Sequence, residues 1–192
     1  MQQRLLPIAL AAGLFVLPAA ASAAKPTDAG IQKVIKTVVN AIRYDKDDIA
    51  AKQVAFDAMA ERIMGASWKD VSAADRKELI AGVETLIRKL SFQKGRDMFK
   101  HLDAILYQPI QTKGKDVLCR TTVVVHRNYK KAEIVIDFVL VERDGEWKTV
   151  DTIMAGESTA EGIHEDQIEP LVDEGGIPAV MKALRDKLSE VS

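Results

Sequence analysis

The chain has 192 residues, of which 47% are hydrophobic and 29% are charged, and its formal net charge is −1. This length and composition are typical of one globular domain that can bury a core. The near-neutral charge excludes a global electrostatic attraction to nucleic acid. The single cysteine, Cys119, excludes an intrachain disulfide and lies in a valine-rich run, so we interpret it as a small buried hydrophobic residue.

Residues 1–23 have the pattern of a secretory signal peptide. Arg4 precedes an apolar run over residues 5–17, and Ala21-Ser22-Ala23 provides small residues for cleavage. The run is shorter than the roughly 20 residues that a transmembrane helix needs. We therefore predict that residues 24–192 form one mature domain in the periplasm. Loss of Arg4 leaves 26 basic and 28 acidic residues, a net charge of −2.

The first part of the mature chain is predicted to be helical. One apolar stripe has helical spacing and consists of Ile31, Val34, Ile35, Val38 and Ile42. A weaker helix is predicted from Asp47 to Met64, with Gly65 ending it. The clearest helix follows Ser72, which forms a capping box with Asp75. Its apolar face consists of Leu79, Ile80, Val83, Leu86, Ile87 and Leu90. Residues 91–100 have no clear period.

Three runs rich in β-branched residues predict an antiparallel meander. They are Val117–Val125, Glu133–Val141 and Trp147–Met154. Asp144-Gly145, between the second and third runs, is a strong signal for a two-residue hairpin turn. Residues 104–110 could add an edge strand, because Pro109 is disfavoured inside a sheet.

The hairpin turn predicts which side chains share a face of the sheet. It pairs Glu142 with Trp147 and Phe138 with Asp151. One predicted face therefore holds Ile134, Ile136, Phe138, Leu140, Trp147, Thr149 and Ile153. The other holds Val135, Val139, Val141, Val150 and Met154. A bulge in the turn would reverse this register. Because both faces are apolar, we expect helices, or helices and an apolar ligand, to cover each.

The C-terminal part is predicted to form two helices. Ser158 or Thr159 can cap the first, which reaches Val172, and Gly175-Gly176 breaks it. Pro178 suits the first turn of the second helix. The predicted fold class is α+β, with helices packed on an antiparallel sheet of about four strands.

Several motifs together resemble the MlaC family. The pattern W-x-x-V-D-x-x-x-x-G-x-S spans residues 147–158 and follows the Ile136-Asp137-Phe138 strand. Met59-Ala60, the Gly65-x-x-Trp68 segment before the capped helix, and Gly175-Gly176 extend the match over nearly all the mature chain. The family comprises periplasmic phospholipid-binding components of ABC transport systems for toluene tolerance and outer-membrane lipid asymmetry.

The resemblance implies a curved sheet, NTF2-like or MlaC-like, with an apolar cavity between the sheet and the helices. The expected role is that of a monomeric carrier that shuttles phospholipid between an outer-membrane lipoprotein complex and an inner-membrane ABC transporter with an MCE-domain protein. Each buried methylene group contributes about 0.8 kcal/mol, so a cavity for two acyl tails can offset their extraction from a bilayer. The expected cavity residues are Ile136, Phe138, Leu140, Trp147, Val150, Ile153, Met154, Met64, Leu86 and Leu90.

Other functions remain open at this stage. His101, His126 and His164 lie in unrelated segments without ligand spacing, so we expect no metal site, and no cofactor motif is present. An enzyme could use Asp151 or Asp137 with a histidine, but the predicted register places these aspartates on opposite faces. A carrier of another lipid, such as a hopanoid, and an interaction module with a solid core are further alternatives.

Overall fold

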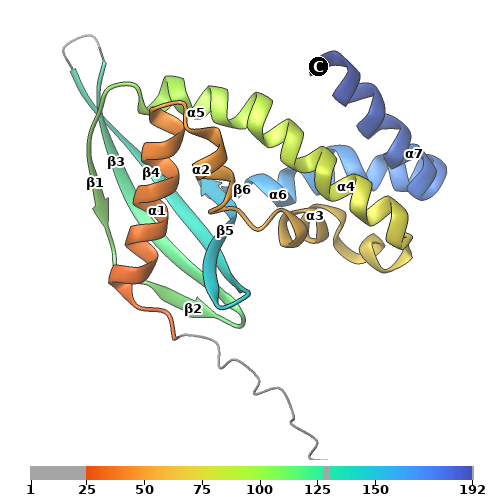
Figure 1. Ribbon diagram of the computed structural model, residues 1–192, viewed down its shortest axis with the longest axis horizontal. Helices are drawn as coiled ribbons and strands as arrows, with labels where there is room; N and C mark the ends of the chain where they lie inside the picture. Colours follow the sequence, from red (N-terminus) through yellow and green to blue (C-terminus); the bar gives the residue numbers. More distant parts are fainter. Residues whose placement is uncertain (1–24, 128–129, 192) are drawn as a thin grey trace, which may run out of the picture.

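The computed structural model describes residues 25–127 and 130–191, so the predicted signal peptide and the Asn128-Tyr129 break lie outside the described residues. The chain forms helices first, then an antiparallel sheet, then helices again. Figure 1 shows a twisted, curved sheet with helix α1 lying across it, and helices α3, α4, α6 and α7 gathered to one side. This arrangement confirms the predicted α+β class.

Helix α1 spans Asp28–Arg43 and confirms the first predicted helix. Thr27 caps it, because its Oγ1 accepts a hydrogen bond from the Gly30 N–H at 3.1 Å. The predicted stripe is turned toward the sheet. The buried residues of α1 are Ile31, Ile35, Val38, Val39, Ala41 and Ile42.

The single helix predicted after α1 is two helices, α2 (Asp47–Ala51) and α3 (Phe56–Met64). The residues between them pair with the sheet instead. The Thr149 N–H donates to the Gln53 carbonyl at 2.8 Å, and the Ala55 N–H donates to the Thr149 carbonyl at 2.9 Å. These bonds to a distant strand replace helical bonds, so the helix is interrupted.

The predicted cap at Ser72 is confirmed, and the Asp75 carboxylate accepts from Ser72 Oγ at 2.7 Å rather than from the Ser72 N–H of a full capping box. A 3-10 turn, η1 (Gly65–Asp70), leads to α4 (Ala73–Leu86), and Ser72 Oγ accepts from the Asp75 N–H at 3.1 Å. After α4, the π-helical segment η2 (Ile87–Ser91) continues into α5 (Phe92–Phe99). Residues 91–99, which have no clear period in the sequence, are therefore helical. Its wider π turn shifts the side-chain positions away from the 3.6-residue period.

The sheet is antiparallel with the order β1-β3-β4-β5-β6, and β2 pairs with β3. Its strands are β1 (Leu102–Tyr107), β2 (Gln111–Lys113), β3 (Asp116–Arg127), β4 (Lys130–Arg143), β5 (Glu146–Met154) and β6 (Glu157–Ser158). The three predicted runs form β3, β4 and β5. The predicted edge strand is β1, which ends before Pro109.

The hairpin turn is confirmed, but one of the strand pairs predicted from it is wrong. Glu142 pairs with Trp147, and Asp144 and Gly145 have φ angles of 55° and 82°. Farther along, a bulge in β5 leaves Val150 as the extra residue, so Asp151 pairs with Val139 instead of Phe138. One extra residue moves every later side chain of the strand to the opposite face.

The bulge corrects the predicted faces at three positions. Met154 pairs with Ile136, and Ile153 pairs with Asp137. Met154 therefore shares the face of Ile136 and Phe138, whereas Ile153 and Asp151 share the face of Val139. We call the Phe138 face the inner face and the Val139 face the outer face.

Each face of the sheet has its own apolar core. The larger core joins the inner face to α1, α3, α4 and α7. The smaller one packs Val139, Val141 and Val150 of the outer face against Ala55 and Ala58. Cys119 belongs to the larger core and is fully buried, as predicted, and its burial raises the pKa of the thiol to about 11.

The C-terminal helices follow the prediction. Ser158 caps α6 (Thr159–Ile163), because its Oγ accepts from the Glu161 N–H at 3.0 Å. A second π-helical segment, η3 (His164–Ile168), leads into α7 (Glu169–Val191), which is kinked at Gly176 with φ 66°. Across residues 25–127 and 130–191, none of the helices has the length and apolar character needed to cross a membrane.

Candidate functional site

The inner face of the sheet is a continuous apolar surface. Strand pairing places Leu140 beside Val117 and Phe138 beside Cys119. All four side chains are at most 5% exposed. Because these neighbours come from the two central strands, the middle of the inner face is apolar across the width of both strands.

Seven of the ten predicted cavity residues belong to the core on this face. They are Ile136, Phe138, Leu140, Trp147, Met154, Met64 and Leu86. Strands β4 and β5 provide five of them. Met64 comes from the end of α3 and is fully buried, and Leu86 comes from the end of α4. The structure therefore brings together residues from both the sheet and the helices that cover it.

The other three predicted residues lie elsewhere. Val150 and Ile153 belong to the smaller core on the outer face. Val150 has the face that the hairpin register predicts, whereas the bulge moves Ile153 there. Leu90 lies in the π-helical segment η2 and is 37% exposed. The Phe92 N–H bonds to the Ile87 carbonyl there, a five-residue step that departs from the regular helical spacing used for the prediction.

The prediction missed inner-core residues from two helices. Ile31 and Ile35 of α1 and Val180, Met181 and Leu184 of α7 pack into the same core. Their helical period is evident in the sequence. The sequence does not show which face of the sheet each helix covers, because this depends on long-range packing.

Asp137 forms an ion pair on the outer face. Its oxygens accept from Arg120 Nε at 2.8 Å and from Arg120 Nη2 at 2.7 Å, a bidentate arrangement. The Asp137 side chain is 8% exposed, whereas Arg120 is 52% exposed. This partner satisfies the buried carboxylate, so Asp137 has a structural role.

Asp151 joins the end of β5 to the start of α6. Its oxygens accept from Ser158 Oγ at 2.6 Å, the Ala160 N–H at 3.1 Å and the Thr152 N–H at 2.8 Å. The predicted placement of the two aspartates on opposite faces is wrong, because Asp151 and Asp137 are both on the outer face. Each carboxylate nevertheless has its own set of donors, which is typical of structural aspartates.

The histidines are also held by local contacts. His164 Nδ1 lies 2.9 Å from the Ile63 carbonyl, and His126 Nε2 lies 3.4 Å from Asp103 Oδ2. The His164 ring packs on Gly65, where a Cβ atom would lie 2.8 Å from the ring. In the described part of the chain, no three His, Cys, Asp or Glu residues are grouped so that they could hold a metal ion.

The fold and the site define a class of protein: an α+β domain with an open curved sheet whose apolar inner face is covered by helices (Figure 1). Comparison of the sequence with protein-family models gives the particular family. The chain belongs to the MlaC protein family, whose model matches residues 31–186. This match confirms the resemblance seen in the sequence motifs. A search of curated proteins found no match.

The fold is supported by a solved structure. The phospholipid-binding protein from Ralstonia solanacearum, solved in complex with a phospholipid, is similar with a TM-score of 0.68 and 16% identity. The alignment covers 85% of this chain and 97% of that chain. A SEC-C motif containing protein from Rhodopseudomonas palustris has a TM-score of 0.40 and 8% identity, over 66% of this chain and 80% of that chain.

Proposed function

We propose that this protein is a periplasmic phospholipid carrier. One observation carries the proposal: in a chain of the MlaC family, the sheet and the helices enclose one continuous apolar core on the inner face. The Ralstonia protein with the same fold holds a phospholipid, which supports the same ligand here. The role is one of binding, because Asp137 and Asp151 are engaged in structural contacts.

The acyl tails would lie between the inner face and the helices. Side chains of the sheet and the helices are buried against one another in this region, so helices would move aside to admit the tails. The segments η2 and η3 are π-helical, and such segments are frequent at functional sites and are places where a helix departs from regular geometry. At about 0.8 kcal/mol for each buried methylene group, two tails can offset the cost of this movement.

Delivery of the lipid requires a second protein. A bound lipid stabilises the form that encloses it, so release needs a partner that binds the open form more tightly. The proposed partners are an outer-membrane lipoprotein complex and an inner-membrane ABC transporter with an MCE-domain protein. The carrier would move between them as a monomer and so maintain the lipid asymmetry of the outer membrane.

Native mass spectrometry of the mature protein from a periplasmic extract tests lipid binding. We expect a stoichiometric adduct with the mass of a diacyl phospholipid, identified by extraction in parallel. An adduct with the mass of a hopanoid would replace the proposed cargo. A clean apo mass, together with no uptake from labelled vesicles, would contradict the carrier function and favour a solid-core interaction module.

A pair of arginine substitutions on β4 tests the position of the lipid. Phe138 is on the inner face and is 5% exposed, whereas Val135 is on the outer face and is 50% exposed. We expect Phe138→Arg to lose lipid retention and Val135→Arg to keep it. A folded Phe138→Arg variant that carries lipid normally would show that the tails do not lie on the inner face.

A further inference from the structure

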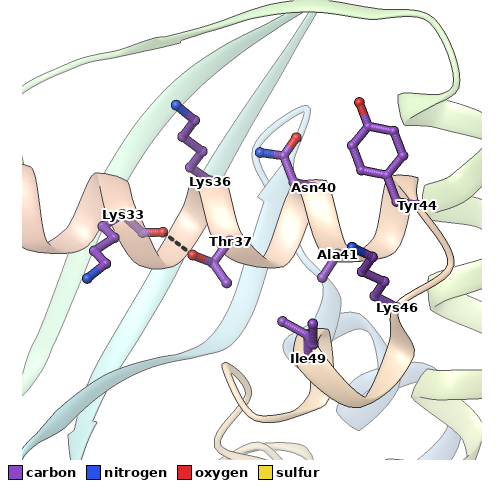
Figure 2. Close-up of a pocket in the computed structure, with 8 residues that line it drawn as sticks. All are labelled: Lys33, Lys36, Thr37, Asn40, Ala41, Tyr44, Lys46 and Ile49. Atoms are coloured by element: carbon purple, nitrogen blue, oxygen red, sulfur yellow. Dashed lines mark hydrogen bonds between the residues drawn. The ribbon is translucent and has the colours of Figure 1, made fainter.

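A groove runs along the exposed side of helix α1, and only Ala41 of its lining belongs to the inner-face core. It has a volume of about 340 Å³ and lies beside helix α2. Figure 2 shows Lys36 and Asn40 of α1 in one row with Tyr44, the residue that follows the helix, and Ile49 of α2 lies next to the groove. The row follows from the spacing of four residues, which places side chains on the same side of a helix.

The groove exposes two large apolar side chains. Tyr44 is 60% exposed and Ile49 is 45% exposed, whereas Ala41 between them in the lining is 4% exposed. Exposed apolar surface in a recess can be buried by a side chain of another molecule. A flat lipid surface would reach the rim of such a recess more easily than its floor.

The rim of the groove is basic. Lys33, Lys36 and Lys46 line it, and all three side chains are exposed. Figure 2 shows Lys33 and Lys36 on α1 and Lys46 near Ile49. Three positive charges around one groove contrast with the overall formal charge of −1. The groove therefore has a local charge that the composition does not reveal.

The nearby carboxylates form ion pairs with arginines, and within the described residues none of them pairs with these lysines. Arg96 Nη1 lies 2.9 Å from Asp45 Oδ1 and 2.7 Å from Asp47 Oδ1. Arg88 Nη1 lies 2.9 Å from Asp48 Oδ1. The acidic residues at the α1–α2 connection are thus engaged with arginines of η2 and α5. The groove lysines remain outside the ion pairs found within residues 25–127 and 130–191.

We infer that this groove docks an acidic segment of a partner protein. One apolar side chain of that segment would contact Tyr44 and Ile49, while flanking carboxylates would face Lys33, Lys36 and Lys46. Complementary charge of this kind mainly increases the association rate and selects the partner. The inference goes beyond lipid carriage, because the groove lies on the side of α1 opposite its buried stripe and can act whether or not lipid is bound.

Site-specific crosslinking in the native cells tests the inference. A photoreactive benzoyl-phenylalanine replaces Asn40 in the full chain, and mass spectrometry identifies the crosslinked peptide. We expect a peptide rich in aspartate and glutamate with at least one large apolar residue. The combined substitutions Lys33→Glu, Lys36→Glu and Lys46→Glu should reduce the crosslink about tenfold or more, because reversed rim charges slow association.

Two further variants make the result specific. The control, Lys77→Glu with Lys113→Glu and Lys115→Glu, changes the net charge equally at exposed positions outside the groove and should leave the crosslink unchanged. Replacing the groove lysines with glutamine should give an intermediate loss, and it serves if the glutamate variant does not fold.

Four results would overturn the inference. They are a crosslink to a neutral or basic peptide, a crosslink equally reduced in both charge-reversed variants, a product that contains only lipid, and the absence of any protein crosslink. A product that contains only lipid would assign the groove to a membrane surface. Lipid content measured on the same samples separates these results from a failure of the carrier function.

Discussion

Alanine substitutions of Phe138 and Val139 test which face of the sheet contacts the lipid. Phe138 and Val139 are neighbours on β4, and they are 5% and 4% exposed respectively. Phe138 belongs to the inner-face core and Val139 to the smaller outer-face core. We predict that Phe138→Ala and Val139→Ala both destabilise the protein, but that only Phe138→Ala weakens lipid retention.

The magnitudes follow from the burial of each side chain. Phe138→Ala should lower the free energy of unfolding by about 3–5 kcal/mol. Val139→Ala removes two methyl groups, and at about 0.8 kcal/mol each plus a cavity cost, the loss is about 2 kcal/mol. Thermal unfolding should show both losses, with Tm falling by about 2–4 °C for each kcal/mol.

Loss of the Phe138 ring should also weaken lipid binding. If the Phe138 ring shields two methylene groups of an acyl tail, its loss removes about 1.6 kcal/mol of binding. This corresponds to an increase of about tenfold in the dissociation constant, because about 1.4 kcal/mol is a factor of ten. Transfer of fluorescent phospholipid to acceptor vesicles, measured well below Tm, gives the dissociation rate. Equal rates for the two variants would refute the assignment of the tails to the inner face.

Three other predictions concern stability and reactivity. Gly65→Ala should lower the free energy of unfolding by about 1–3 kcal/mol. Gly65 has φ 56°, and a Cβ atom there would lie 2.8 Å from the His164 ring. An unchanged urea midpoint would contradict this prediction. Burial alone would raise the pKa of Asp57, but a backbone N–H and the Arg143 guanidinium outweigh it, and the pKa is below its usual value of 3.8. The folded state therefore gains stability above pH 3.8 and loses it as the pH falls through the lower folded pKa, and Asp57→Asn should reduce this dependence in acid titrations of unfolding. Burial raises the pKa of Cys119 to about 11, so iodoacetamide at pH 8 should label it slowly in the folded protein and rapidly in urea; rapid labelling without urea would show that the thiol is accessible.

The sequence by itself determined the elements whose signals are local. The predicted structure is found for the stripe of α1, the helix cap at Ser72, the turn at Asp144-Gly145 and the break at Gly175-Gly176. Each depends on residues within one or two turns of the chain, so neighbouring side chains and backbone preferences are sufficient to specify it. The motif order likewise sufficed to indicate the MlaC family.

Only the tertiary structure decided which residues meet. The bulge at Val150 moves Ile153 and Asp151 to the outer face and Met154 to the inner face. The bonds of Thr149 with Gln53 and Ala55 separate α2 from α3. In both cases the deciding contacts join segments far apart in the sequence, and a shift of one residue reverses the side on which a strand residue lies. Periodicity therefore identified the apolar residues, whereas long-range pairing selected those that form the inner-face core.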